Sequence, residues 1–542
     1  MDADSLIRQH EAMAARRANW ETLWERVARL VLPRLDDFNG KKSQADDRSL
    51  QQYDAFPMGA LDKFAAAIEA GLMPRTTLWH HLITGDEAVD ADHTAKAYME
   101  DLNKRLWDAR YSPSSNFASQ AHEKRISLGA FGTGAMLVEP KIGGGIRYRT
   151  IHLSEVYAEE NLDGMVDTVH RKFELTARQA VQTFKENTPA KVMKAFNSGK
   201  LLDCFEFLHC VGPREDYERG RIDARGLPFV GYYLFQDGRE VIREEGYHEQ
   251  PYIVTRYSSS PREVYGRSPA IQRLPDIAML NEMKRVTIDA ANMAIDPPTL
   301  SRDDVSEFDL APGTHNPGTM DDNGRPMVMP WNSGVRPEIA RELMIDTRNQ
   351  IDDGFMGVYF RVLLENPQMT ATQAMLVAQQ QGQMTAPVIG RMQSEWLGPM
   401  IRRESGILFR QGKHPEMPAR IREWIESTGK GLQIEYQSPM TRAARAEEAV
   451  AILRAFETLA PIAQIDPTVY KSFDTVEIAR IVAEVNGVPM SAIKSPERLA
   501  QEAAQEQEQA ALGEVLTAAP IAAQTAKTLA EAGRLSQSNP AF

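Results

Sequence analysis

Paired carboxylates are the residues of this sequence that are best suited to metal-dependent chemistry. Adjacent aspartates occur at 303–304, 321–322 and 352–353. Carboxylates that converge in one pocket bind divalent cations and support nuclease chemistry. Two adjacent acids without a partner motif are more typical of a solvated surface. We therefore interpret the three pairs as surface residues, and we predict no catalytic residue, no metal site and no cofactor.

Histidine and cysteine, the other common metal ligands, are not spaced for a metal site. His80 and His81 are adjacent, so in a strand their imidazoles point to opposite faces. Cys204 and Cys210 are six residues apart in a predicted strand, which places both on one face. A single C-x5-C pair is not a zinc-binding pattern. We expect two buried thiols that act as small hydrophobic residues.

The nucleotide-binding and hydrolase motifs are absent as well. The sequence contains no G-x-x-x-x-G-K-[ST] loop, no H-E-x-x-H and no G-x-S-x-G. The glycines of Gly132-Thr133-Gly134 precede a predicted strand and do not open a helix, so we interpret them as a tight turn. The motif search therefore favours a protein that is not an enzyme.

Length and charge limit the remaining classes. A chain of 542 residues is too long for one hydrophobic core, so we expect several domains. The formal net charge is -13, whereas proteins that grip DNA by its phosphates are usually basic on the gripping face. A like-charged protein can still surround DNA without holding it. The charged N-terminus lacks an apolar signal segment and no stretch has about 18 apolar residues, so we expect cytoplasmic synthesis and no membrane partner.

The first half of the chain predicts helices followed by an antiparallel sheet. Apolar residues at helical spacing indicate a helix over 4–32, and further helices are predicted over 57–73, 90–110 and 114–130. From 134 to 175 the period changes to two, and Asn161-Leu-Asp-Gly164 is typical of a hairpin turn. The pattern predicts an α+β fold, with more strands at 201–211, 228–235, 239–245 and 251–257.

Two long helices follow, separated by an irregular segment. Ser268-Pro269 is a good helix start, while Pro275 marks either a kink or the start of the longer part. This helix extends to about Ile295. Residues 296–335 are rich in Pro and Gly, and the second helix starts near 336. We predict a helix pair with an irregular tip.

The rest of the chain is predominantly helical. Asn366-Pro367 breaks the chain and Thr370-Ala-Thr-Gln373 is typical of a capping box, so 357–369 is predicted to be a loop between two helices. Interrupted helices continue to about 411, and "LQIEYQSP" is predicted to be a strand. From 441 onward the sequence is rich in Ala, Glu and Gln and helical in pattern.

The order of these parts resembles that of the portal proteins, the head-to-tail connectors of short-tailed phages. The stretch "PYIVTRYSSSPREVYGRSP" resembles the family's Pro-Tyr strand and its Tyr-Gly-Arg-Ser entry to a long helix. "GLMPRTTLWHHL" resembles its N-terminal Pro…Trp segment, and "ENPQMTATQAMLVAQQ" resembles its Thr-Ala helix start. "FETLAPIAQIDPTVY" and "IARIVAEVNGV" resemble its C-terminal helices, so the resemblance covers nearly the whole chain.

The resemblance implies a multidomain portal fold that assembles as a ring of about twelve subunits. It implies an α+β wing, a two-helix stem, an irregular clip and a helical crown. The corresponding ranges are 1–265 for the wing, 266–295 and 336–356 for the stem helices, 296–335 for the clip, 357–369 for the channel loop, 370–439 for further wing helices and a strand, and 440–542 for the crown and C-terminal tail.

The resemblance also implies which residues face DNA, neighbouring subunits and partners. The candidates for lining a DNA channel are Arg361, Glu365, Asn366, Gln368, Glu338, Glu342 and Asp346. The candidates for subunit packing are Ile339, Leu343, Ile351 and Phe355. The candidates for partner docking on the clip are Asp303, Asp304, Phe308 and Trp331.

The charges suggest how such a channel would treat DNA. A wall with a few arginines and four acidic residues would hold phosphates weakly, which lets DNA slide; the acidic residues are Glu338, Glu342, Asp346 and Asp352. Arg361 is the clearest candidate for a phosphate contact, but a salt bridge to Glu365 four residues on is an equal alternative.

The implied function is passage of double-stranded DNA through a ring at one capsid vertex of the virion. The implied partners are the large subunit of the packaging terminase, the major capsid and scaffolding proteins, and the head-tail adaptor and tail proteins. The alternatives are another phage assembly protein without a channel and, as a poorer fit, a metal-dependent nuclease.

Overall fold

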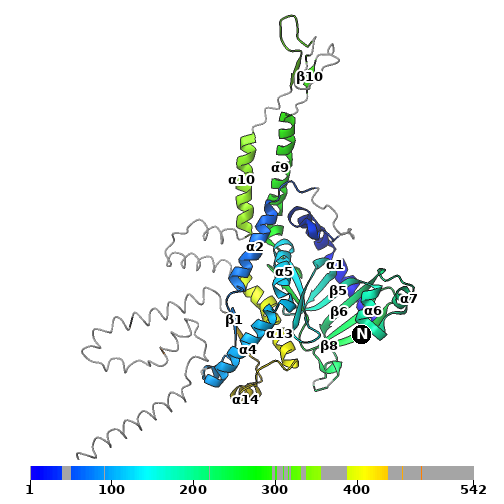
Figure 1. Ribbon diagram of the computed structural model, residues 1–542, viewed down its shortest axis with the longest axis vertical. Coiled ribbons are helices and arrows are strands. Elements are labelled where there is room, and N and C mark those ends of the chain that lie inside the picture. The colour runs from blue at the N-terminus through cyan, green and yellow to red at the C-terminus, as the bar shows by residue number, and fades with distance from the viewer. Residues whose placement is uncertain are drawn as a thin grey trace, which may run out of the picture. The chain divides into compact units, whose positions relative to one another are not determined.

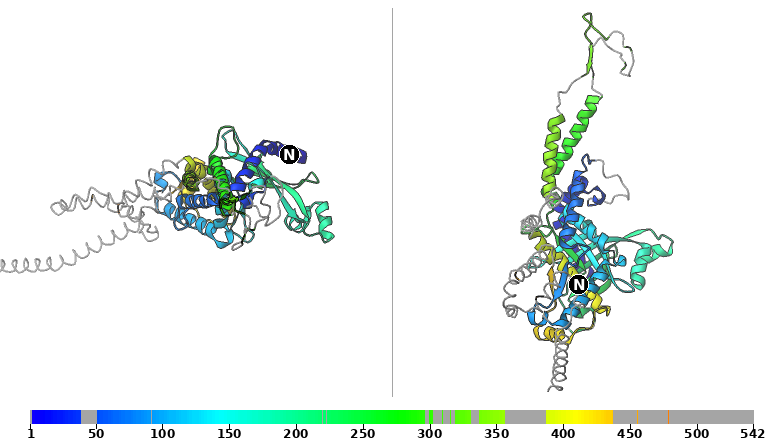
Figure 2. Two further views of the ribbon diagram at one scale, coloured as in Figure 1. Left: turned by 90° about the horizontal axis from the view of Figure 1, so that it is seen from above. Right: turned by 60° about the vertical axis from the view of Figure 1, so that its left-hand side comes forward.

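The computed structural model describes residues 2–38, 51–295 without 91, 219 and 222, then 299–301, 319–330, 337–355 and 387–436, and the single residues 309, 315, 455 and 478. The chain divides into two compact units, one of residues 1–79 with 105–414 and one of 80–104 with 415–542. Helices and sheets both contribute, as Figures 1 and 2 show, which confirms the predicted α+β class.

The larger unit contains a five-stranded antiparallel sheet in the order β4-β5-β6-β7-β8. All five strands are neighbours in the sheet in the order in which they follow one another in the chain, and β4 and β5 meet at the predicted turn. There the Gly164 N–H donates to the Asn161 carbonyl at 3.0 Å, and Gly164 has a φ of 73°. The strands are β4 (Val156–Glu160), β5 (Val166–Thr176), β6 (Cys204–Pro213), β7 (Phe229–Phe235) and β8 (Glu240–Tyr247).

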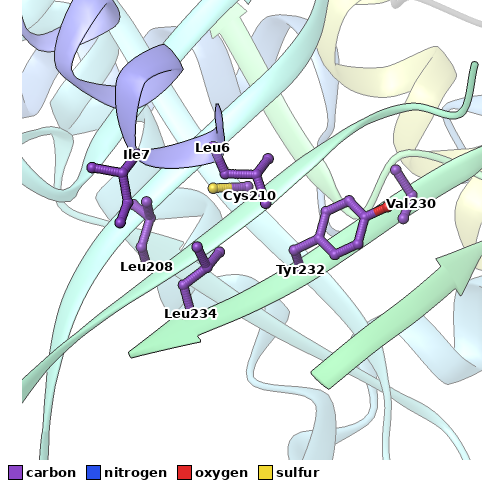
Figure 3. Close-up of a cluster of buried hydrophobic side chains, with 7 residues drawn as sticks. All are labelled: Leu6, Ile7, Leu208, Cys210, Val230, Tyr232 and Leu234. Carbon is purple, nitrogen blue, oxygen red and sulfur yellow. The ribbon is translucent and has the colours of Figure 1, made fainter. Parts of the chain in front are cut away.

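Alternate side chains of each strand point to opposite faces of this sheet, and helices cover both faces. Helix α1 (Ala3–Val31) packs Leu6 and Ile7 against Leu208 of β6, in the cluster that Figure 3 shows. Helices α6 (Ala177–Phe184) and α7 (Ala190–Asn197) cover the other face, where Phe207 lies in their core. The sequence analysis predicted helices followed by an antiparallel sheet, and it did not predict α6 and α7, which lie between strands of that sheet in the chain.

The two cysteines differ in exposure. Cys210 is buried in the cluster beneath α1, as predicted. Cys204 is exposed, so the prediction of a second buried thiol is wrong. Cys204 is the first residue of β6 and shares a face with Leu208 and Cys210, but it is not part of the buried cluster beneath α1.

A second, three-stranded antiparallel sheet has the order β3-β2-β9. Its strands are β2 (Thr133–Pro140), β3 (Ile146–Ile151) and β9 (Tyr252–Arg256). The buried helix α5 (Phe117–Phe131) packs between this sheet and α2 (Phe56–Leu72). The sheet also contacts a π-helical turn, η6 (Gln393–Leu397), and the helix α13 (Gly398–Arg410) that follows it, and Tyr148 of β3 meets both Phe117 of α5 and Glu404 of α13.

The smaller unit contains a two-stranded antiparallel ladder of β1 (His80–Ile83) and β12 (Gln433–Tyr436). His80 is buried and His81 is half-buried, which confirms that they point to opposite faces of a strand. Two further helices of this unit are α3 (Glu87–Asp90) and α14 (Ala419–Thr428), and α4 (His93–Tyr111) begins here and ends in the larger unit.

The predicted helix pair is present in the larger unit. It comprises α8 (Pro269–Gln272), α9 (Leu274–Ile295) and α10 (Pro337–Gly354), and Figures 1 and 2 show α9 and α10 side by side. Pro275 lies in the first turn of α9, where its missing N–H has no helical partner to lose, so it marks the start of the long helix. Short strands β10 (Thr299–Ser301) and β11 (Val328–Pro330) pair between the two helices.

Candidate functional site: a helix pair and its anchor

The segment that leads into the helix pair is fixed to the body by two side-chain hydroxyls. Ser268 caps α8 by accepting a hydrogen bond from the Ile271 N–H at 2.9 Å, and its hydroxyl donates to the Ala130 carbonyl at 2.7 Å. Both groups are buried, so each bond replaces one that water would make. The buried Tyr265 hydroxyl accepts the Ala158 N–H at 3.1 Å. Helix α8 therefore starts from a defined position on α5.

Glycine is required between these two residues. A Cβ atom on Gly266 would lie 2.2 Å from the Gly132 carbonyl oxygen, a distance at which the backbones would have to separate. The Gly266 N–H also donates to the Thr133 hydroxyl at 2.9 Å. The Tyr-Gly-Arg-Ser stretch is therefore a packing motif, in which one residue permits close approach of two backbone segments and its neighbours provide the hydrogen bonds.

The lower part of α9 is held by the polar segment that precedes α2. The Asn281 side chain accepts the N–H groups of Tyr53 and Asp54, at 2.7 and 3.3 Å, and donates to the Gln51 carbonyl at 2.9 Å. One amide group thus satisfies three backbone groups. Just below it on α9, Leu274, Ile277 and Leu280 are buried.

The lower part of α10, which is its C-terminal part, is held by two ion pairs. Arg348 pairs with Asp54 at 2.6 Å, and Lys63 of α2 pairs with Asp352 at 3.1 Å. Both carboxylates are buried, and both cations are more exposed. Asp352 was expected on an acidic channel wall, but it instead faces the body, because α10 presents this side to α2.

The apolar stripe of α10 divides between two environments. Ile351 and Phe355 are buried, and the Phe355 ring lies 6.4 Å from that of Phe64 on α2. These two side chains therefore already pack within the chain. Leu343, two turns earlier than Ile351, is 50% exposed. The stripe continues toward the start of α10, where no layer of described residues covers it. The predicted packing against other subunits therefore concerns this uncovered part, which is the upper part of α10 in Figure 1.

The upper part of α9 likewise exposes apolar side chains. Val286 is 51% exposed and Ile295 is 83% exposed, and an apolar face of this kind normally marks an interaction surface. Seven large apolar side chains on the two helices are substantially exposed: Met279, Val286, Ile288, Met293, Ile295, Leu343 and Ile345. They would be stabilised by a partner, since burial of apolar area is the main favourable term in association.

Charged side chains accompany this apolar surface. Arg285 pairs with Glu282 and with Asp289, both on α9. Of the residues predicted to line a channel, Glu342 and Asp346 are exposed on α10. The side chains of Glu338 and Ile339 and the residues Arg361, Glu365, Asn366, Gln368, Asp303, Asp304, Phe308 and Trp331 lie outside the described part of the structure, as does the predicted loop at 357–369.

An ion pair that the sequence analysis did not identify lies behind this anchor. Arg256 of β9 pairs with Glu395 of η6 at 2.7 Å and with Glu160 at 2.7 Å, and Arg256 and Glu395 are both buried. Burial opposes the charge of Arg256, but its hydrogen bonds with Glu395 and Glu160 raise its pKa. The only signal in the sequence is a charged residue at the end of an otherwise uncharged strand. A cavity of about 590 Å³ adjoins the pair.

The acidic pairs do not form a metal site among the described residues. Asp352 is paired with Lys63, and Asp321 accepts the N–H groups of Asn323 and Arg325 in a turn. In the described part of the chain no group of three or more His, Cys, Asp or Glu side chains is close enough to hold a metal ion. No helix there is long and apolar enough to span a membrane.

An α+β body that fixes the base of a helix pair and leaves the upper part of that pair apolar and exposed is typical of a subunit of a larger assembly. Residues 3–493 match the family of bacteriophage head to tail connecting proteins, and the chain belongs to this family. The resemblance found in the sequence is thereby confirmed. The chain is accordingly a structural protein and not an enzyme.

Two relatives are portal proteins by name. The chain is 25% identical over 500 residues to the probable portal protein of Bordetella phage BPP-1. This alignment covers 89% of the chain and 87% of the relative. The chain is 24% identical over 552 residues to the portal protein of Salmonella phage epsilon15. This second alignment covers 98% of the chain and 96% of the relative.

Proposed function

We infer that the chain is a phage portal protein that forms a ring at one vertex of the capsid, with double-stranded DNA entering and leaving through the ring. The observation that carries this inference is the family match over residues 3–493, together with two portal relatives that align along nearly their whole length. Synthesis takes place in the host cytoplasm, and the protein becomes part of the virion.

The exposed apolar surface of α9 and α10 supports assembly into a ring. In a ring each helix pair has a neighbour on both sides, so Val286, Ile288 and Leu343 would be covered by the adjacent subunits. Twelve subunits follow from the family resemblance. In this arrangement α9 and α10 are the stem, residues 296–335 are the clip, and 440–542 are the crown.

The acidic side chains of the stem fit passage of DNA without tight binding. Glu342 and Asp346 are exposed on α10, and carboxylates repel phosphates. By helical spacing Glu338 would continue this face, and the proposed channel loop at 357–369 would add Arg361, Glu365, Asn366 and Gln368. The clip residues Asp303, Asp304, Phe308 and Trp331 would dock the terminase large subunit during packaging and the adaptor and tail proteins afterwards. The major capsid and scaffolding proteins would contact the wing.

The first experiment is electron microscopy of the purified chain with class averages, and native mass spectrometry for the subunit count. The proposal expects closed rings with a central hole. A folded monomer under several salt conditions and in the presence of the scaffolding protein would contradict it.

A variant pair then tests the interface. Leu343→Glu places a charge in the exposed apolar surface of α10 and should abolish rings while the subunit stays folded. Leu162→Glu is the matched control, because Leu162 is fully exposed in the β4–β5 turn and belongs to neither helix of the pair. Rings of normal yield for Leu343→Glu would exclude this face as the interface. Thermal unfolding by circular dichroism separates loss of assembly from loss of folding.

A further inference from the structure

Helices α6 and α7 form a basic region on an acidic chain. Between Thr176 and Asp203 there are five basic and two acidic side chains, a net charge of +3, whereas the whole chain carries -13. Both helices lie beside the five-stranded sheet, away from α9 and α10 (Figure 1). The basic region is therefore separate from the helix pair of the proposed function.

Most of these cations have no internal role. Lys191 pairs with Asp237 at 2.7 Å. The other four are exposed and have no carboxylate within ion-pair distance among the described residues: Arg178, Lys185, Lys194 and Lys200. An exposed cation without a partner keeps its full charge for an external ligand.

Two leucines lie among these cations. Leu202 is 82% exposed and Leu201 is 40% exposed. The backbone brings the cations to them, because the Arg178 N–H donates to the Leu201 carbonyl at 3.2 Å and the Lys200 N–H donates to the Ala195 carbonyl at the end of α7. We call Arg178, Lys194, Lys200, Leu201 and Leu202 the basic-leucine surface.

The basic-leucine surface is held on a rigid base. Ala177, Ala180 and Phe184 of α6 and Val192 of α7 are buried against Phe207 and Phe235 of the sheet. Helix α6 also begins with a complete capping box, in which Thr176 and Gln179 satisfy each other's backbone N–H groups. Because these contacts involve other side chains, substitutions on the exposed surface should leave the fold intact.

We propose that the basic-leucine surface is a docking site for an acidic amphipathic helix of another protein. An apolar centre with a charged rim is the usual anatomy of a protein interface, in which the rim steers association and the centre supplies affinity. Nucleic acid is a poorer fit, since phosphates use the cations but give Leu202 no partner. The unpaired cations set the charge of the ligand, and the exposed leucines require an apolar face on it.

The test uses the full-length chain and a display library of random 16-residue peptides. Peptides that bind the wild-type chain are selected after removal of those that bind a triple variant, Lys194→Glu, Lys200→Glu and Leu202→Ser. The proposal expects selected peptides that are rich in Glu and Asp, with apolar residues three and four positions apart. It expects the triple variant to bind a synthetic copy about tenfold or more weakly.

A matched control keeps the charge and apolar changes but moves them elsewhere. The control variant is Arg402→Glu, Lys430→Glu and Leu162→Ser, at three exposed positions outside the basic-leucine surface. It should bind the selected peptide as the wild type does. Both triple variants should give thermal unfolding curves like that of the wild type.

Three results would overturn the proposal. The first is a selection without enrichment of acidic, apolar-faced peptides. The second is binding of a 20-base-pair DNA duplex that the surface variant loses and the control keeps, which would identify a phosphate-binding surface. The third is loss of rings in the surface variant, which would identify a contact between copies of this chain.

Discussion

The body and the helix pair use charged residues in opposite ways. In the body, Arg110 and Glu404 are completely buried and bonded at 3.1 Å, and the Tyr148 hydroxyl donates to the same carboxylate at 2.6 Å. On α9, Arg285 and its partners Glu282 and Asp289 are each at least 40% exposed. The core of the body therefore satisfies its buried charges internally, whereas the upper helix pair leaves both charges and apolar side chains exposed.

A second buried arginine, Arg17, also has its hydrogen-bond partners within the body. Arg17 of α1 donates to the carbonyls of Leu153, Ser154 and Val156, at distances from 2.5 to 3.1 Å. Its guanidinium also lies 3.6 Å from the centre of the Tyr157 ring. An arginine with this many partners has one position, so it fixes α1 against the start of β4. The helix pair has no comparable contact above its base among the described residues.

The largest effect is expected from a substitution that breaks the buried ion pair of Arg110 and Glu404. Glu404→Gln leaves Arg110 charged in a site that water does not reach, and should lower the free energy of unfolding by about 3–5 kcal/mol. Burial opposes the charge of Arg110, and Glu404 outweighs it and raises the arginine's pKa, so the carboxylate is what keeps the charge stable. Urea unfolding measures the loss.

The control for this variant is the same change on the helix pair. Glu282→Gln removes an exposed partner of Arg285 and should leave the urea midpoint unchanged. A similar loss for both variants would show that burial does not distinguish the two regions.

The next prediction concerns histidines beneath α1. His10 is buried against Tyr157 and 6.0 Å from the ring of His170, with Arg17 and Lys172 nearby. Burial and then the charges of Lys172 and Arg17 lower the pKa of His10 to about 4, and burial and His10 lower that of His170 to about 3. Both histidines are therefore neutral in the folded protein at pH 5.

This makes the body sensitive to acid. In the unfolded chain a histidine binds a proton below its ordinary pKa of about 6.5, so stability falls as the pH drops below that value and the loss continues toward the folded pKa. The loss is about 1.4 kcal/mol per pH unit for each histidine. His10→Gln should therefore reduce the fall in stability between pH 7 and pH 5 by about 2 kcal/mol.

Urea unfolding at the two pH values tests this prediction. Val27→Ala is the control, because Val27 is a buried apolar residue of the same helix and its loss should be equal at both pH values. If His10→Gln retained the full pH dependence of the wild type, His10 would not be the group that titrates.

Local features of the fold were predictable, because their causes lie within a few residues of each other. Ser268 starts α8, Pro275 starts α9, and Asn161 to Gly164 make the β4–β5 turn, each through bonds to near neighbours. Helices α6 and α7 were missed although each has an apolar face, since at eight residues each they are too short to be stable alone and owe their stability to packing on the sheet.

Long-range pairs were not predictable. Arg110 and Glu404 are 294 positions apart, and Arg256 and Glu395 are 139 apart, so no spacing rule relates them. The stripe on α10 shows the same limit in another form. Helical spacing indicated that Ile351 and Leu343 share an apolar face, but it does not say whether the chain's own body or another molecule covers each one.

The base of the helix pair lies between the two extremes and should give an intermediate effect. Asp54 is buried and Arg348 is about one-third exposed, so their ion pair is only partly screened. A double-mutant cycle with Asp54→Asn and Arg348→Gln should give a coupling of roughly 1 kcal/mol. The same cycle on Lys191 and Asp237, which are both exposed, should give about 0.5 kcal/mol or less. Equal coupling energies in the two cycles would show that the ion pair at the base of the helix pair is no stronger than a fully exposed one.

The smallest effect is expected at the upper helix pair, with Arg285→Ala. Arg285 bonds Glu282 at one end and Asp289 at the other, but all three side chains are in contact with water, which replaces the lost bonds. The urea midpoint of the isolated subunit should therefore not move. Assembly is a different matter, because the variant adds uncompensated acidic charge to α9 beside the apolar surface. If the subunit is unaffected while rings form less readily at low salt and recover at high salt, the charges of this region act between molecules and not within one. A shift of the midpoint as large as that of Asp54→Asn would mean that the upper helix pair is also stabilised from within the chain.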